Sequence, residues 1–85
     1  MTTLQGTRIT SGQLRDFEAC PGAYGKLDGE WLTCLPTGDL CSLHGWAVTE
    51  HADGTITASP SILMHALPGQ QYWHGYLERG MWREV

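Results

Sequence analysis

Residues 45–63 read GWAVTEHADGTITASPSIL and place an Asp-Gly pair between two runs rich in β-branched residues, a strong β-hairpin signal. A two-residue loop would place Val48 and Ile56 on opposite faces of the hairpin. A three-residue loop, residues 52–54, instead pairs Val48 with Ala58 and Glu50 with Ile56. We prefer this second register, with Gly54 at the left-handed position of a bulged turn. The apolar face that it creates consists of Trp46, Val48, Ile56 and Ala58.

A second tight hairpin is predicted near the end of the chain, where residues 73–82 read WHGYLERGMW. With a three-residue loop at 78–80, Tyr76 faces Trp82 and Leu77 faces Met81. A cross-strand aromatic pair of this kind contributes about 0.2–1 kcal/mol relative to two alanines. One face of this hairpin must belong to the core, so the other is a candidate contact surface.

Weaker signals elsewhere predict further short strands and little helix. Residues 30–35 (EWLTCL) alternate, with Trp31, Thr33 and Leu35 on one face and Leu32 and Cys34 on the other, and the turn signal at 36–39 predicts a hairpin across 31–43. The remaining segments are interpreted as an edge strand or loose arm at 2–10, a short helical turn at 11–17, a loop at 20–29 and a strand end or bend at Pro60. The fold class that follows is mainly β: a small antiparallel sheet, sandwich or partly open barrel of five to seven short strands, with at most one short N-terminal helix. We expect residues 1–85 to form a single domain.

Composition narrows the classes of function. Nine acidic and five basic residues give a net charge of −4, which argues against a sequence-independent nucleic-acid binder, because such a protein needs a basic face. No apolar run approaches the roughly 20 residues that span a bilayer, and residues 1–12 lack the pattern of a signal peptide. Three irregularly spaced cysteines are typical of reduced thiols rather than of a disulfide framework. We therefore expect a cytosolic protein that contacts no membrane.

Residues able to bind metal or perform catalysis form no recognisable signature. Structural zinc sites normally contain paired ligands such as C-x₂-C, and this chain has none. The set that could hold a metal is Cys34, Cys41, His44 and His74, although cysteines used as small buried apolar residues are the simpler interpretation. The chain also lacks a nucleophile motif, an evident carboxylate pair and a phosphate-binding loop. The sequence therefore predicts a protein that is not an enzyme and needs no cofactor.

Aromatic residues near the end of the chain are the best candidates for binding. Tryptophan, tyrosine and arginine are enriched at the energetic centres of protein interfaces. A hydrophobic fraction of 41% leaves the four tryptophans to supply much of the core, so we expect two or three of them to be buried. The candidate partner-binding residues are Trp73, His74, Tyr76, Arg79 and Trp82.

Several short motifs resemble those of a family of small bacteriophage and prophage proteins of unknown function. They are CPG at 20–22, GW at 45–46, T-x-x-PSI at 57–62, WHGYL at 73–77 and G-x-W at 80–82, within a resemblance that covers roughly residues 17–83. Members of that family often have a CPGC-type knuckle and a further cysteine just before WHG, which together look like a zinc-ribbon site. Here Ala23 ends the knuckle and residues 71–72 are Gln-Tyr, so two expected ligands are missing. The resemblance therefore implies phage origin and a β fold, but it weakens the case for metal.

These observations lead to two functional hypotheses. The first is a phage-encoded, non-enzymatic binding protein that acts by protein–protein contact in the cytoplasm of the host bacterium. Its most specific form is an inhibitor of a bacterial defence system, of the anti-CRISPR type, whose partner is a CRISPR effector or another defence component. The alternative is a metal-stabilised, zinc-ribbon-like structural or accessory phage protein. The sequence is also compatible with a homodimer, because small β domains have strand edges to cover.

Overall fold

Nine short strands form two sheets in the part of the chain that the structure describes. The computed structural model describes residues 3–64, 68–69 and 71–85. Sheet A has the strand order β1-β9-β8-β7-β6, and sheet B has the order β2-β3-β4-β5. The strands are β1 Thr3–Gln5, β2 Thr7–Ile9, β3 Ala23–Leu27, β4 Glu30–Cys34, β5 Leu40–Ser42, β6 Ala47–Glu50, β7 Ile56–Met64, β8 Trp73–Glu78 and β9 Met81–Glu84, and the helix α1 is Leu14–Glu18.

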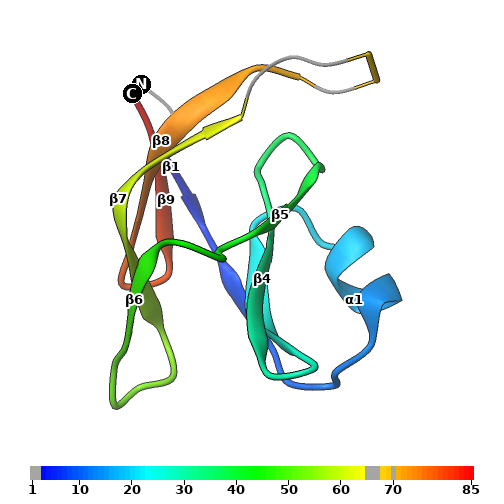
Figure 1. Cartoon of the computed structure of the whole chain (residues 1–85), viewed down its shortest axis with the longest axis vertical. Helices are drawn as coiled ribbons and strands as arrows, with labels where there is room; N and C mark the ends of the chain where they lie inside the picture. The colour runs from blue at the N-terminus through cyan, green and yellow to red at the C-terminus, as the bar shows by residue number, and fades with distance from the viewer. Residues whose placement is uncertain (1–2, 65–67, 70) are drawn as a thin grey trace.

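The two sheets and the helix form three layers. Sheet B lies between sheet A and α1, so the helix is on the side of sheet B that faces away from sheet A (Figure 1). The predicted mainly β fold with one short N-terminal helix is therefore confirmed, with nine strands among the described residues rather than the five to seven expected. None of the described helical residues belongs to a segment long and apolar enough to cross a membrane.

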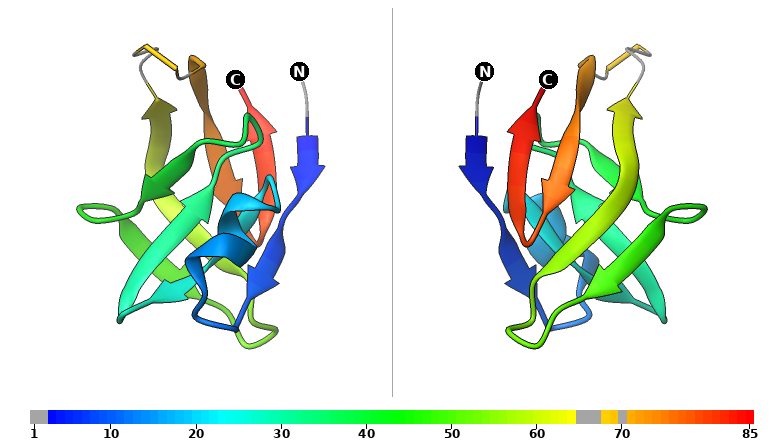
Figure 2. Two further views of the ribbon diagram at one scale, coloured as in Figure 1. Left: turned by 90° about the vertical axis from the view of Figure 1, so that its right-hand side faces the viewer. Right: turned by 90° about the vertical axis from the view of Figure 1, so that its left-hand side faces the viewer.

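The first two strands of the chain, which belong to different sheets, link the sheets. Strand β1 is antiparallel to β9 in sheet A, and after Gly6 the chain continues as β2, which is parallel to β3 in sheet B. The Gly6 N–H donates to the carbonyl of Gly80 at 2.7 Å, where the chain crosses from one sheet to the other. Figure 2 shows this segment running along the side of the molecule. Of the two interpretations offered for residues 2–10, an edge strand is correct for the described residues.

Sheet B contains a strand where the sequence was interpreted as a loop. Strand β3 occupies half of residues 20–29, and a two-residue turn at Asp28 and Gly29 connects it to β4, with Leu27 opposite Glu30. Both turn residues have positive φ, 53° and 82°, as in the type I′ turns that suit the twist of a hairpin. The loop prediction was wrong because three glycines within ten residues concealed a hairpin that this Asp-Gly pair closes.

Both faces of sheet B are covered, and the two sets of residues predicted to alternate in β4 lie on opposite faces. Trp31 and Leu35 pack in or against the main core between the sheets, whereas Leu32 and Cys34 belong to a second cluster beneath the helix. Phe17 of α1 is completely buried in this second cluster. The predicted hairpin across 31–43 is confirmed by the pairing of β4 with β5.

The β6–β7 hairpin has the register predicted from its apolar face. Val48 is opposite Ala58, Glu50 is opposite Ile56, and Gly54 has a φ of 87°. Strand β7 does not end at Pro60: it continues to Met64 through an irregularity in its pairing with β8 between Ala58 and Ile62. This irregularity lets the strand pass proline, which cannot donate to the ladder.

The β8–β9 hairpin differs from its prediction by one residue in register. Its loop has two residues, Arg79 and Gly80, with φ of 47° and 75°, so Leu77 is opposite Trp82 and Tyr76 is opposite Arg83. The predicted Tyr76–Trp82 pair is therefore wrong. Because side chains alternate along a strand, the one-residue change turns Trp82 into the core beside Leu77 and leaves Tyr76 outside.

Candidate contact surface

The side of sheet A that faces away from sheet B has no element packed on it among the described residues (Figure 2). Alternate residues of β8 and β9 are buried, and those between them point outward. Large apolar side chains remain exposed on this side, with 37% of Tyr76 and 41% each of Leu63 and Met81 accessible. We call this surface the outer face; its central residues are Leu63, His74, Tyr76, Glu78, Met81 and Arg83.

Tyr76 is held in place by charged neighbours on the outer face. The guanidinium of Arg83, its cross-strand partner, lies 4.9 Å from the centre of the Tyr76 ring. The same guanidinium donates from Nη2 to Glu78 Oε1 at 2.6 Å. Exposed cation–π contacts contribute only about 0.5–1 kcal/mol, but they restrict the rotamers of the ring. Binding through Tyr76 would therefore cost less conformational entropy than binding through a freely rotating side chain.

His74 and Arg79 lie at opposite ends of β8. Nε2 of His74 is 3.1 Å from Ser61 Oγ, a hydrogen bond that joins β8 to β7, and the His74 ring is half-buried. Arg79 lies in the β8–β9 turn, and its backbone N–H donates to Thr57 Oγ1 at 3.0 Å. Three of the five candidate partner-binding residues, His74, Tyr76 and Arg79, thus lie outside the core.

The other two candidates, Trp73 and Trp82, are core residues. They are 3% and 1% exposed, and their rings meet edge to face with centroids 5.5 Å apart. The indole N–H of Trp82 donates to the carbonyl of Gly22 at 2.7 Å, so its one polar group is used inside the protein. Both side chains are therefore part of the core and neither belongs to the outer face.

The residues proposed for metal binding are not brought together. Cys34 is buried under α1, and Cys41 belongs to the other face of sheet B, since it is opposite Thr33. His44 is exposed, 3.9 Å from Glu30, and His74 is in sheet A. No three potential metal ligands cluster anywhere in the described ranges. Burial raises the pKa of both the Cys34 and Cys41 thiols, which favours the protonated form over the thiolate that binds metal.

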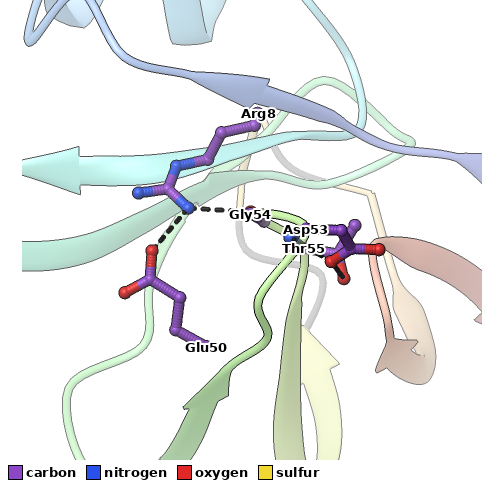
Figure 3. A network of polar contacts seen from close by, with 5 residues as sticks. All are labelled: Arg8, Glu50, Asp53, Gly54 and Thr55. Atoms are coloured by element: carbon purple, nitrogen blue, oxygen red, sulfur yellow. Dashed lines mark hydrogen bonds and ion pairs between the residues drawn. The ribbon is translucent and has the colours of Figure 1, made fainter.

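A polar network around Arg8 links the two sheets (Figure 3). Arg8 of β2 donates from Nη1 to Glu50 Oε2 at 3.0 Å and to the Gly54 carbonyl at 2.7 Å. Its guanidinium also lies 5.0 Å from the centre of the Trp31 ring. In the same turn, the hydroxyl and backbone N–H of Thr55 donate to Asp53, and these bonds lower the Asp53 pKa. No sequence motif marks an arginine that joins strands 42 residues apart.

Two hollows on the described surface are small. One of about 30 Å³ lies near Trp73 and Trp82, and one of about 230 Å³ lies near Trp31 and the β3–β4 turn. Small-molecule sites usually measure roughly 300–1,000 Å³. The outer face is consequently the more prominent candidate site.

Comparison with known proteins gives no independent guide to function. No family model matches this chain, and no curated protein or solved structure matches it either. The resemblance to small phage proteins therefore stays a prediction from short motifs.

Proposed function

We propose that this protein is a small non-enzymatic binding module that acts by protein–protein contact through the outer face. The observation that carries this proposal is the exposure of Tyr76, Leu63 and Met81 on a sheet face that no described element covers. Protein interfaces combine an apolar, aromatic centre with a polar rim, and tyrosine, methionine and arginine are enriched in them. Glu78, Arg79 and Arg83 provide polar groups beside these apolar side chains.

The shape of the surface supports binding of a macromolecule rather than catalysis. The outer face is one side of an open sheet, whereas the two hollows described above are smaller than typical substrate pockets. His74 and Ser61 are hydrogen-bonded to each other, but neither has an acidic residue among its hydrogen-bond partners in the described ranges.

The partner that we propose is a component of a bacterial defence system, so that the protein would act as an anti-CRISPR-type inhibitor in the host cytoplasm. This choice rests on the resemblance to phage proteins and on the net charge of −4, which suits a basic partner such as a nucleic-acid-binding effector. Electrostatic attraction would speed the encounter, and the apolar centre of the outer face would hold the complex.

The test uses affinity purification from a bacterium with an active CRISPR system, together with phage plating on the same strain. We expect the wild-type chain to recover an effector component and to raise plating efficiency. Tyr76→Ala should lose both effects, and Leu14→Ala should keep both, because Leu14 is equally exposed but lies on α1. Recovery of no defence component with unchanged plating would refute the inhibitor proposal. Recovery that Tyr76→Ala leaves intact would refute the role of the outer face.

A further inference from the structure

Strand β6 is an uncovered edge of sheet A whose backbone polar groups are available for pairing. The His51 N–H donates to the Thr55 carbonyl, which fixes the alternation of the ladder, so Thr49 and Ala47 bond toward β7. The N–H and C=O groups of Val48 and Glu50 must then point away from β7. None of these four groups has a hydrogen-bond partner in the described part of the chain.

The sequence of β6 does little to prevent strand pairing. Natural edge strands are usually protected by lysine, proline or a bulge. Strand β6 reads AVTE, and its one charge, Glu50, is already bound by Arg8 at 3.0 Å. The other edge strands, β1, β2 and β5, have only three residues each, so β6 offers the longest free edge.

We infer that β6 pairs with β6 of a second copy of this chain, antiparallel and about a twofold axis at Thr49. This register places Val48 opposite Glu50 of the second copy. All four free backbone groups of each copy are then used, in four hydrogen bonds between the two strands. Thr49 is then directly opposite Thr49 of the second copy, and two threonines form a favourable cross-strand pair. A register centred on Glu50 would oppose two carboxylates, and one centred on Val48 would pair fewer of the free groups. The sequence of β6 is thus self-complementary in one register.

The dimer would be a single ten-stranded sheet with both outer faces on the same side. This follows because directly opposite residues of antiparallel strands point to the same side of a sheet. Together with the proposed function, this arrangement makes the protein bivalent, with two Tyr76 surfaces available to one partner assembly. The area buried between two β6 strands would be small compared with the roughly 1,200 Å² of stable complexes. We therefore expect the dimer to dissociate on dilution, with a Kd of about 10–100 μM.

Sedimentation equilibrium on the purified full chain, from about 1 μM to 1 mM, tests the inference without any partner. We expect the average mass to rise from 9.4 kDa toward twice that value. Thr49→Lys should weaken dimerisation about tenfold or more, because it opposes two like charges across the twofold axis. Gln5→Lys adds the same charge on exposed β1, at the other edge of sheet A, and should leave dimerisation unchanged.

A charge-exchange experiment decides the register. Mixing Thr49→Lys with Thr49→Glu chains should restore the dimer, since the two residues face one another only in the proposed pairing. A wild-type chain that stays monomeric at 1 mM overturns the inference. So does a dimer that Thr49→Lys leaves intact, or a mixture that fails to recover while each variant is folded by circular dichroism.

Discussion

The two sheets differ in whether their outer sides are covered. Sheet B has the main core on one side and α1 on the other, where Phe17 is completely buried. Sheet A has the core on one side only, and its outer side leaves 37% of Tyr76 accessible. A chain of this size has few large apolar residues, and outside the main core they cover only the outer side of sheet B. The uncovered outer face of sheet A is therefore the surface through which we propose that the protein binds its partner.

The largest effect should come from the inner side of sheet A. Trp82→Ala removes a buried ring that packs against Trp73 and donates to Gly22, so we expect the free energy of unfolding to fall by about 3–5 kcal/mol. Urea unfolding followed by far-UV circular dichroism measures it. A loss below 1 kcal/mol would mean that the two sides of sheet A do not differ as described.

A similar but smaller loss should follow from uncovering the outer side of sheet B. Phe17→Ala removes the only completely buried side chain of α1, and we expect a loss of about 3 kcal/mol. Leu14→Ala, on the same helix but exposed, is the control and should cost less than about 0.5 kcal/mol. Equal effects of the two variants would show that α1 does not cover sheet B.

The link between the sheets should contribute less than either cluster. Arg8→Met breaks the bonds to Glu50 and to the Gly54 carbonyl, and we expect a loss of about 1–2 kcal/mol because the site is partly exposed. Glu50→Gln leaves the Gly54 bond in place and should cost about half a kcal/mol or less. If both substitutions cost the same, the carbonyl bond contributes nothing to joining the sheets.

The smallest effect is a pH dependence from beneath the helix. Burial raises the pKa of the Cys34 thiol above its ordinary value near 9.0, so the folded state favours the protonated thiol. Its contribution is complete below that value and declines as pH rises above it, when the unfolded chain ionises more readily. Urea midpoints at pH 7 and pH 10 should differ less in Cys34→Ala than in wild type. An unchanged pH dependence would show that the thiol does not become buried on folding.

Local turn chemistry explains how much of the fold was predictable. The register at 46–58 followed from the sequence because only a three-residue loop gave one apolar face, and Gly54 could adopt positive φ. The register at 76–83 did not, because a two-residue turn needs Arg79 at positive φ, which is uncommon for a residue with a side chain. Strand β3 was not predicted, because the glycines around it indicated a loop. Gly25 is needed there because a Cβ would lie 2.3 Å from the Ile9 carbonyl oxygen.

The contact surface was only partly predictable for the same reason. The one-residue change in register decides that Trp82 is buried and that Tyr76 is exposed. The hydrogen bonds of Arg8 depend on how the two sheets pack, which a pattern along the chain does not report.

The central claim is that the outer face of sheet A serves binding rather than stability, and one comparison on Tyr76→Ala tests it most directly. The measurement is a binding titration of the recovered defence component by isothermal calorimetry, with urea unfolding of the same samples. We predict that Tyr76→Ala weakens binding by about 2 kcal/mol, roughly thirtyfold, while its free energy of unfolding changes by less than about 1 kcal/mol. Unchanged binding, or a loss of stability as large as that of Trp82→Ala, would contradict the claim.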